Sequence, residues 1–278
     1  MSSFFPEDPT RWVTVDGRVR LAAYTRGTGE PLVLINGLGA SVHDWGPTVE
    51  ILARNRRLIA FDTRGAGRSA APDVPMCLEE LADDAASVLE AYGLESTDVV
   101  GYSMGGMVAQ ILAVHRPGRV RRLVLMATHA GARSAVRSMP RARAVMSIAD
   151  DQPRKEVVRM QYEAFVAPDF PLRRPEEFER MLSVRTSHLA PLYAWRRQLR
   201  AVKESERVHL VGRIRAPTLV IHGEEDPLIP FGNGERLHEL IPDSRLVSIQ
   251  GCGHMLNWEK PDEVAEAIEE FLSSRPTS

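Results

Sequence analysis

The sequence predicts an α/β fold: a mostly parallel sheet covered by helices on both faces and interrupted by an all-helical segment. Three observations support this. Short apolar runs alternate with segments of helical period over the first 130 residues, the same rhythm returns after about residue 215, and residues 130–214 contain several prolines but no run typical of a buried strand. The 278 residues are enough for one large α/β domain with an insertion.

The first half of the chain predicts six strands and three helices. An opening hairpin over 12–15 and 19–24 has Asp16-Gly17 as a two-residue turn. Residues 78–92 have apolar positions at helical spacing. The remaining runs are mostly apolar, and 31–35 is continuously apolar, as a strand buried on both faces requires. They predict strands at 31–35, 57–61, 97–102 and 123–126, with further helices near 45–53 and over 104–115.

The last quarter of the chain repeats the alternation. We expect strands at 217–223 and 245–249, and helices at 235–240 and 261–271, the last with Pro261 in its first turn. The helical segment 130–214 therefore lies between two strands of one sheet and is best interpreted as a cap over its edge. This divides the chain into a core domain (1–129 and 215–278) and a helical cap (130–214). Arginines outnumber acidic residues in the cap. They form solvated helix faces, or one or two of them face inward and hold an anionic substrate group.

Composition narrows the function classes. The formal net charge of −2 provides no argument for nucleic-acid or anionic-membrane partners. Cys77 and Cys252 make neither a disulfide framework nor a metal-ligand spacing, so we expect reduced thiols and no metal or cofactor. We see no basic-then-apolar leader and no apolar run of about 18 residues, which predicts a cytoplasmic protein without membrane partners. The oligomeric state is not predicted.

The most informative segment is 101–106, which begins at the end of the predicted strand at 97–102 and continues into the predicted helix at 104–115. Its pattern G-x-S-x-G places Ser103 at the apex of a sharp strand-to-helix turn. Gly101 and Gly105 leave room for that turn because they carry no side chain. The hydroxyl would project from the carboxyl edge of the sheet, which predicts that Ser103 is a nucleophile.

A serine hydroxyl needs a base that takes its proton, and His254 is the best-placed histidine. It lies in the loop 251–254 after the last strand, where its ring can reach the same edge of the sheet. His43 and His129 also lie near strand ends and remain rival candidates.

The base in turn needs an acid that orients it, and Asp226 follows the strand at 217–223. The order Ser103, Asp226, His254 is the order of a known class of catalytic triads. Glu224 or Glu225 could replace Asp226 only through a shifted loop.

A tetrahedral intermediate needs backbone N–H donors for its oxyanion. We expect one from Met104, directly after Ser103, and the other from the loop 36–39, with Leu38 as the best candidate. A plain strand-to-helix turn is the alternative interpretation of that loop.

Five motifs in this order resemble α/β-hydrolase fold proteins, over about residues 12–271; they lie at 34–39, 62–69, 101–106, 217–226 and 251–254. The resemblance implies an eight-stranded sheet with a cap that sets specificity. It is closest to 3-oxoadipate enol-lactonases and related carboxylesterases, which share Asn36, the Ser-Met-Gly-Gly elbow and the type of segment at 119–125. We expect Trp195 to contact substrate, with Tyr193, Phe165 and Met146 as further candidates to line an acyl or alcohol pocket.

The sequence thus predicts a serine hydrolase that cleaves a small carboxylic ester or lactone through an acyl-enzyme. Enol-lactone or carbon–carbon bond hydrolysis is the first alternative. A non-hydrolytic small-molecule receptor on the same fold is the second, since fold alone does not define function.

Overall fold

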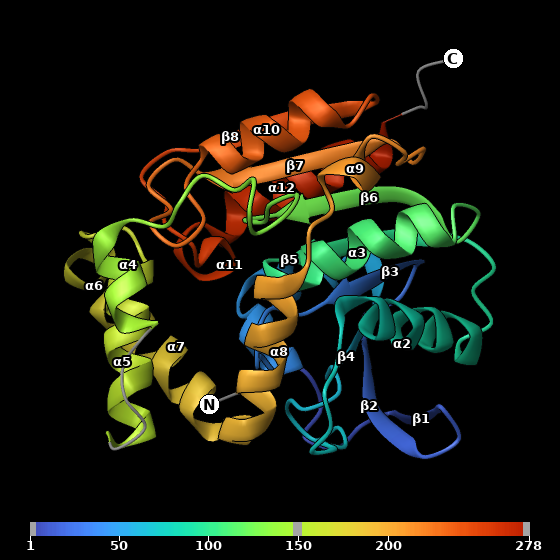
Figure 1. The fold of residues 1–278 in the computed structure, drawn as a ribbon, viewed down its shortest axis with the longest axis horizontal. Helices are drawn as coiled ribbons and strands as arrows, with labels where there is room; N and C mark the ends of the chain where they lie inside the picture. The colour runs from blue at the N-terminus through green and yellow to red at the C-terminus, as the bar shows by residue number, and fades with distance from the viewer. Residues whose placement is uncertain (1–3, 147–151, 275–278) are drawn as a thin grey trace.

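The computed structural model describes residues 4–146 and 152–274, and an eight-stranded sheet forms its centre (Figure 1). The antiparallel pairs β1–β2 and β2–β4 lie at one end, and all other neighbouring strands are parallel. The predicted α/β class and strand number are therefore confirmed. The strands are β1 (Arg11–Val15), β2 (Val19–Arg26), β3 (Glu30–Ile35), β4 (Arg56–Phe61), β5 (Thr97–Tyr102), β6 (Val120–Met126), β7 (Thr218–Gly223) and β8 (Ser244–Ile249).

The opening hairpin differs slightly from the expected two-residue turn. Asp16 and Gly17 both have positive φ angles, as the central residues of such a turn require. However, Val15 pairs with Val19, so Arg18 is an extra residue in the connection.

The strand order β1-β2-β4-β3-β5-β6-β7-β8 places a switch point between β3 and β5. From β3 the chain continues to β4 on one side and then returns to β5 on the other. The loops after β3 and β5 therefore diverge at the carboxyl edge of the sheet, where open α/β sheets bind their ligands. The candidate oxyanion loop follows β3, and Ser103 follows β5.

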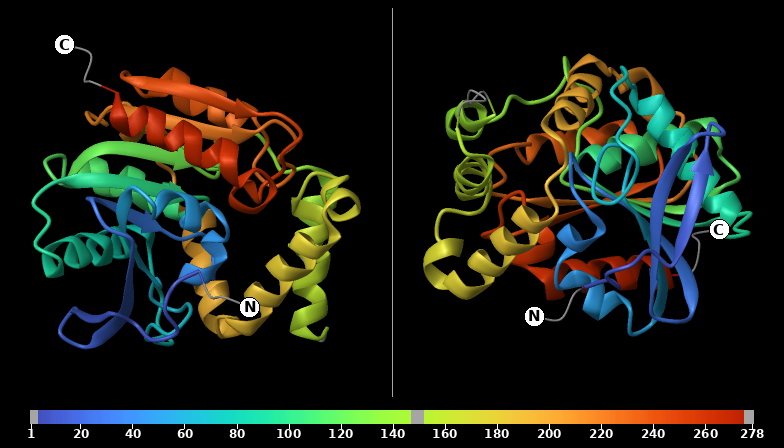
Figure 2. Two further views of the ribbon diagram at one scale, coloured as in Figure 1. Left: turned by 180° about the vertical axis from the view of Figure 1, so that it is seen from behind. Right: turned by 90° about the horizontal axis from the view of Figure 1, so that it is seen from below.

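Helices cover both faces of the sheet, because successive residues of each central strand point to opposite sides. Leu32 and Leu34 belong to a core cluster with α1 and α12, whereas Val33 and Ile35 belong to a second cluster with α2 and α3. Figure 2 shows α12, in red, on the face opposite α2 and α3. The helices of this part are η1 (Val42–Trp45), α1 (Thr48–Leu52), α2 (Leu78–Ala91), α3 (Met104–His115), α10 (Gly232–Leu240), α11 (Leu256–Glu259) and α12 (Pro261–Ser273).

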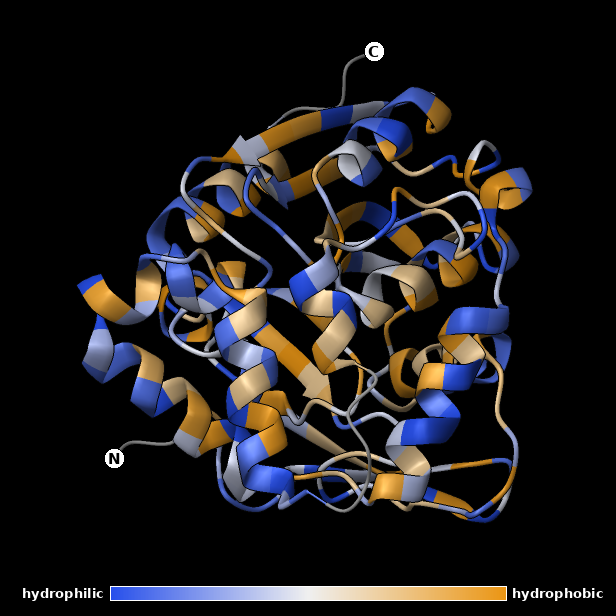
Figure 3. Cartoon of the chain, turned by 60° about the vertical axis from the view of Figure 1, so that its left-hand side comes forward, coloured by the Kyte–Doolittle hydropathy of each residue, from blue (hydrophilic) through white to orange (hydrophobic). Residues whose placement is uncertain are grey.

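Residues 130–214, here called the insertion, form helices between β6 and β7, apart from one isolated β-bridge between Gly131 and Glu206. Residues 147–151 lie outside the described residues. Figure 1 shows α4 to α7 beside the sheet and α8 crossing in front of it, and Figure 3 shows both apolar and polar segments in these helices. The helices are α4 (Pro140–Val145), α5 (Arg154–Phe165), α6 (Phe170–Arg173), α7 (Pro175–Ser187), α8 (Leu192–Glu204) and α9 (Val208–Val211).

Within 4–146 and 152–274, no helix is both long and apolar enough to span a bilayer. The same ranges contain no cluster of three or more His, Cys, Asp or Glu side chains suited to a metal ion.

Candidate active site

Ser103 lies at the apex of the turn between β5 and α3, with φ 55° and ψ −117°. This left-handed conformation is strained for a residue with a side chain and is typical of functional turns. Two contacts hold it: the Ser103 N–H donates to Met126 O (2.9 Å), and Thr128 Oγ1 donates to Ser103 O (2.8 Å). The turn also needs its glycines, because a Cβ on Gly105 would lie 2.0 Å from Ile35 O.

A chain of two hydrogen bonds joins Ser103 to His254 and Asp226. His254 Nε2 lies 3.1 Å from Ser103 Oγ, and His254 Nδ1 lies 2.7 Å from Asp226 Oδ2. A carboxylate only accepts, so Nδ1 carries the proton of the neutral ring and Nε2 is free to accept the serine proton. The three residues come from separate loops and meet within hydrogen-bonding distance, as a nucleophile, a base and an orienting acid must.

Asp226 is held in place by backbone donors. Its Oδ1 accepts from the N–H groups of Leu228 (2.9 Å) and Ile229 (2.8 Å), and the residue is buried. Glu224 and Glu225, the alternative acids, are exposed. The acid nearest the histidine is therefore the one that burial and the turn geometry select.

The rival histidines have other surroundings. The ring of His43 stacks on that of His188, with centroids 4.5 Å apart. His129 accepts a hydrogen bond at Nδ1 from the Gly131 N–H (3.1 Å). The geometry therefore favours His254 over both as the partner of Ser103.

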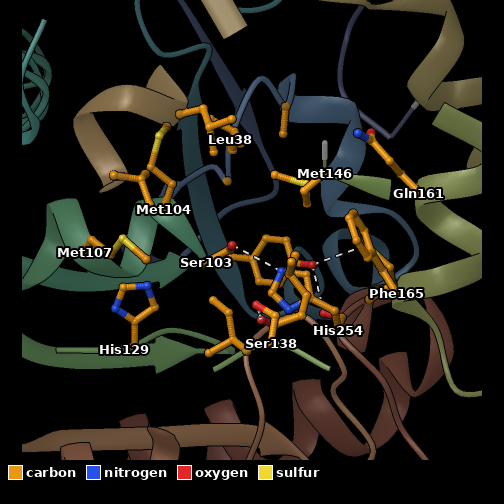
Figure 4. A pocket seen from close by; sticks show the side chains of 18 of the residues that line it. Leu38, Ser103, Met104, Met107, His129, Ser138, Met146, Gln161, Phe165 and His254 are labelled. Carbon is orange, nitrogen blue, oxygen red and sulfur yellow. Dashed lines mark hydrogen bonds between the residues drawn. The ribbon is translucent and has the colours of Figure 1, made fainter. Parts of the chain in front are cut away.

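The loop after β3 reaches Ser103 from the neighbouring strand. A Cβ on Gly37 would lie 3.4 Å from Ser103 Cβ, and Figure 4 shows Leu38 and Met104 on the same side of Ser103. Met104 is the first residue of α3, so its N–H lies outside the helical ladder. Across the part of the chain that the structure describes, neither Leu38 N–H nor Met104 N–H has an acceptor. Both donors are available to an oxyanion.

A cavity of about 540 Å³ opens over Ser103, between the sheet edge and the insertion (Figure 4). This volume suits a small-molecule substrate. Trp195, Phe165 and Met146 line it, as expected, but Tyr193 does not, and that expectation was wrong. The hydroxyl of Tyr193 instead donates to Ala71 O (2.6 Å) on the surface, because its position on α8 points away from the cavity.

Residues 30–261 match the α/β hydrolase fold family. The chain belongs to this family. This α/β hydrolase is 30% identical to 2-hydroxymuconate semialdehyde hydrolase of Pseudomonas sp. (strain CF600), over 92% of this chain and 91% of that one.

Two solved structures are also similar. The enol-lactonase from Burkholderia xenovorans LB400 superposes with a TM-score of 0.81 at 25% identity, over 95% of this chain and 100% of that one. An esterase from Rhodococcus sp. ECU1013 superposes with a TM-score of 0.80 at 27% identity, over 95% and 98% of the two chains. The protein is accordingly a hydrolase.

Several residues that the sequence did not single out support the site of this α/β hydrolase. The Tyr102 hydroxyl donates to His254 O (2.8 Å), and the His254 N–H donates to Phe165 O in the insertion (2.8 Å). Glu259, on α11, accepts from the N–H groups of Gly253 and Met255 on either side of His254, each at 2.9 Å. It also accepts from the Ala167 N–H (2.8 Å). Glu259 therefore joins the His254 loop to the insertion.

The insertion also holds the loop after β3. On α8, Gln198 Oε1 accepts from the Gly39 N–H (2.7 Å), while its Nε2 donates to Arg64 O (2.9 Å). On α7, Arg185 donates to Leu38 O (3.2 Å) and to Gly39 O. Both side chains are buried. No local pattern marks them, since Gln198 lies 159 positions from Gly39 along the chain.

The sequence left open whether any arginine of the insertion faces inward, and Arg185 does. It lines the cavity, and its guanidinium lies 3.5 Å from the Asp44 carboxylate. Its charge is therefore balanced within the protein.

Glu259 leads to a prediction about stability and pH. Burial raises the pKa of Glu259 from 4.5 to about 7, against the opposing effect of its three backbone donors. Because the pKa is higher in the folded state, this group's stabilisation is full below about pH 4.5 and is lost as pH rises through about 7. Glutamine does not titrate, so the Glu259→Gln variant loses this dependence. We expect the unfolding free energy of the parent minus that of the variant, here called the gap, to decrease from pH 5 to pH 8.

Denaturant unfolding at the two pH values measures this gap. Glu266→Gln is the matched control, because Glu266 is an exposed residue of α12. A Glu259→Gln gap that stays the same or widens with pH would contradict the prediction.

Proposed function

We propose that this α/β hydrolase cleaves a small carboxylic ester or lactone through an acyl-enzyme, with Ser103, His254 and Asp226 as its catalytic triad. The observation that carries the proposal is the hydrogen-bonded chain Asp226–His254–Ser103 at the base of a cavity. The similarity to an enol-lactonase and an esterase supports this bond class.

In the proposed reaction Ser103 Oγ attacks the substrate carbonyl carbon while His254 Nε2 takes the serine proton. The N–H groups of Leu38 and Met104 stabilise the oxyanion. His254 then returns the proton to the leaving oxygen, which leaves an acyl group on Ser103. Water, deprotonated by His254, attacks that ester and releases the acid. Asp226 keeps the ring in the required tautomer and stabilises its charged form.

We assign residues 130–214 to a cap and the remaining chain to the core domain. The cap supplies Trp195 to the substrate cavity and holds both the loop after β3 and the His254 loop. Its position therefore controls the site as well as the shape of the cavity.

Hydrolysis of p-nitrophenyl esters from acetate to decanoate tests the function. We expect turnover by the parental protein, labelling of Ser103 by a fluorophosphonate, and a chain-length optimum that reports the cavity size. Labelling without ester turnover would instead favour a narrower reaction, such as carbon–carbon bond hydrolysis. The 30% identity to 2-hydroxymuconate semialdehyde hydrolase favours that second candidate. Absence of both would refute a serine hydrolase and favour a receptor.

The role of the cap in holding the loop predicts the effect of Gln198→Leu. The substitution keeps the side chain's size but leaves the buried Gly39 N–H without its acceptor. We expect the loop to shift and kcat to fall by about 10- to 100-fold, since a displaced oxyanion donor costs up to about 10²–10³. KM should change much less, because the loop acts mainly on the transition state.

Steady-state kinetics on the best p-nitrophenyl ester measure this split. Gln161→Leu is the comparison, because Gln161 lines the cavity from α5 and donates to Val145 O instead of to the loop. It should change KM more than kcat. A Gln198→Leu variant that affects KM alone would rule out the positioning role.

A further inference from the structure

His129 is a buried titratable side chain in the cavity that the proposed reaction does not use. It follows β6 and comes directly after Thr128, whose hydroxyl contacts the carbonyl oxygen of Ser103. Figure 4 shows its ring beside Met107, on the opposite side of Ser103 from Phe165. His129 therefore lies near Ser103, on the side of the cavity formed with Met107.

The hydrogen bonds of His129 determine which ring nitrogen carries the proton. Nδ1 accepts from the Gly131 N–H at 3.1 Å, so it holds no proton. The neutral ring must then be protonated at Nε2. His129 thus presents a single ring N–H, at Nε2, because the Gly131 N–H occupies Nδ1.

The surroundings also keep the ring neutral. The fully buried Arg207 donates through Nη2 to His129 O (3.1 Å). Burial, with a smaller contribution from the charge of Arg207, lowers the pKa of His129 to about 3. A second proton would also displace the Gly131 N–H from Nδ1. At neutral pH His129 is therefore a donor without charge.

This donor has no hydrogen-bond partner among the residues that the structure describes. Across residues 4–146 and 152–274, no acceptor contacts His129 Nε2. Nor is Nε2 among the fully buried polar atoms that lack a hydrogen bond, so it faces open space. Since His129 lines the cavity, that space is the substrate site.

The reaction geometry assigns a part of the substrate to this wall. The carbonyl oxygen must point to Leu38 and Met104, and the leaving group must lie where His254 can protonate it. Figure 4 places His254 on the side of Phe165. The remaining substituent of the carbonyl carbon, the acyl chain, then extends toward Met107 and His129.

We propose that His129 Nε2–H binds a neutral acceptor oxygen in the acyl chain of the substrate, so that the enzyme selects oxygen-bearing acyl groups over plain alkyl ones. This rests on the proposed acyl-enzyme reaction and specifies its substrate class. The acceptor is a keto, ether or hydroxyl oxygen a few bonds from the reacting carbonyl. A site built to hydrogen-bond such a group rejects the analogue that lacks it.

The test compares p-nitrophenyl hexanoate with its 4-oxo and 5-oxo derivatives, each corrected for its rate of alkaline hydrolysis. In the parental protein we expect kcat/KM for one oxo ester to exceed that for hexanoate by about tenfold or more. In His129→Phe, which keeps a ring but has no donor, the ratio should fall to about one. In His129→Gln, whose amide can donate, part of the preference should return.

A parental protein without preference for either oxo ester, or a preference that survives in His129→Phe, overturns the proposal. The same ratio can be read from the rates at which p-nitrophenyl phosphonates with pentyl, 3-oxopentyl and 4-oxopentyl chains, in which phosphorus takes the place of the carbonyl carbon, modify Ser103. If ester turnover is missing, the proposed function is refuted, and the ratio of the phosphonate rates still supports or overturns the role of His129.

A second readout is independent of any reaction. The ¹⁵N NMR signals of the His129 ring should show a proton on Nε2 alone between pH 6 and pH 8. A ring protonated at Nδ1, or charged in this range, contradicts the proposal.

Discussion

The Ser103→Ala variant is expected to lose about 10⁶-fold in kcat, and His254→Ala should lose nearly as much. Ser103 Oγ and His254 Nε2 lie 3.1 Å apart and act together. The hydroxyl is a poor nucleophile until the imidazole takes its proton. Removing either partner abolishes the same step. The double variant should therefore be no slower than either single variant, and the oxyanion donors should leave a small residual rate.

Single-turnover and steady-state assays on the best p-nitrophenyl ester measure these rates. Circular dichroism verifies that each variant is folded. His238→Ala is the matched control, since His238 is an exposed residue of α10 and its removal should leave turnover at the parental level. Losses that multiply in the double variant would show that Ser103 and His254 act in separate steps.

Asp226→Asn is expected to lower kcat by about 10⁴-fold while leaving the geometry of the site nearly intact. The carboxylate accepts from His254 Nδ1 at 2.7 Å and so places the ring proton there. An amide can turn its NH₂ group toward Nδ1, which moves the ring proton to Nε2 and leaves no acceptor for the serine proton. KM should change little, because Asp226 is buried behind the ring.

Kinetics as a function of pH, together with a structure of the variant, test this prediction. Glu225→Gln is the control, because Glu225 is the exposed neighbour that could serve only through a shifted loop. It should retain parental activity. If Glu225→Gln lost activity and Asp226→Asn did not, the acid would have to be reassigned.

Local sequence patterns were enough to predict the α/β sheet and the three residues that meet at its edge. The run at 31–35 is apolar throughout, as a strand buried on both faces must be. Gly101 and Gly105 are informative because only a residue without a side chain tolerates the close backbone contacts on either side of Ser103. Asp226 and His254 could be found because both follow strands of a parallel sheet, whose carboxyl ends share one edge.

The supporting residues could not be predicted, because their roles depend on contacts between distant segments. Gln198 contacts Gly39 only because α8 packs against the loop after β3. Tyr193 lies on the same helix but points to the surface instead of into the cavity. Glu259 looks unremarkable along the chain, and the sequence indicated His129 only as a rival base. Burial and specific backbone N–H groups give the first its raised pKa and the second its fixed tautomer. Strand patterns and glycines thus specified the catalytic edge from local sterics and hydrophobic burial, while the orientation of the buried polar groups was decided only when the insertion and the sheet came together.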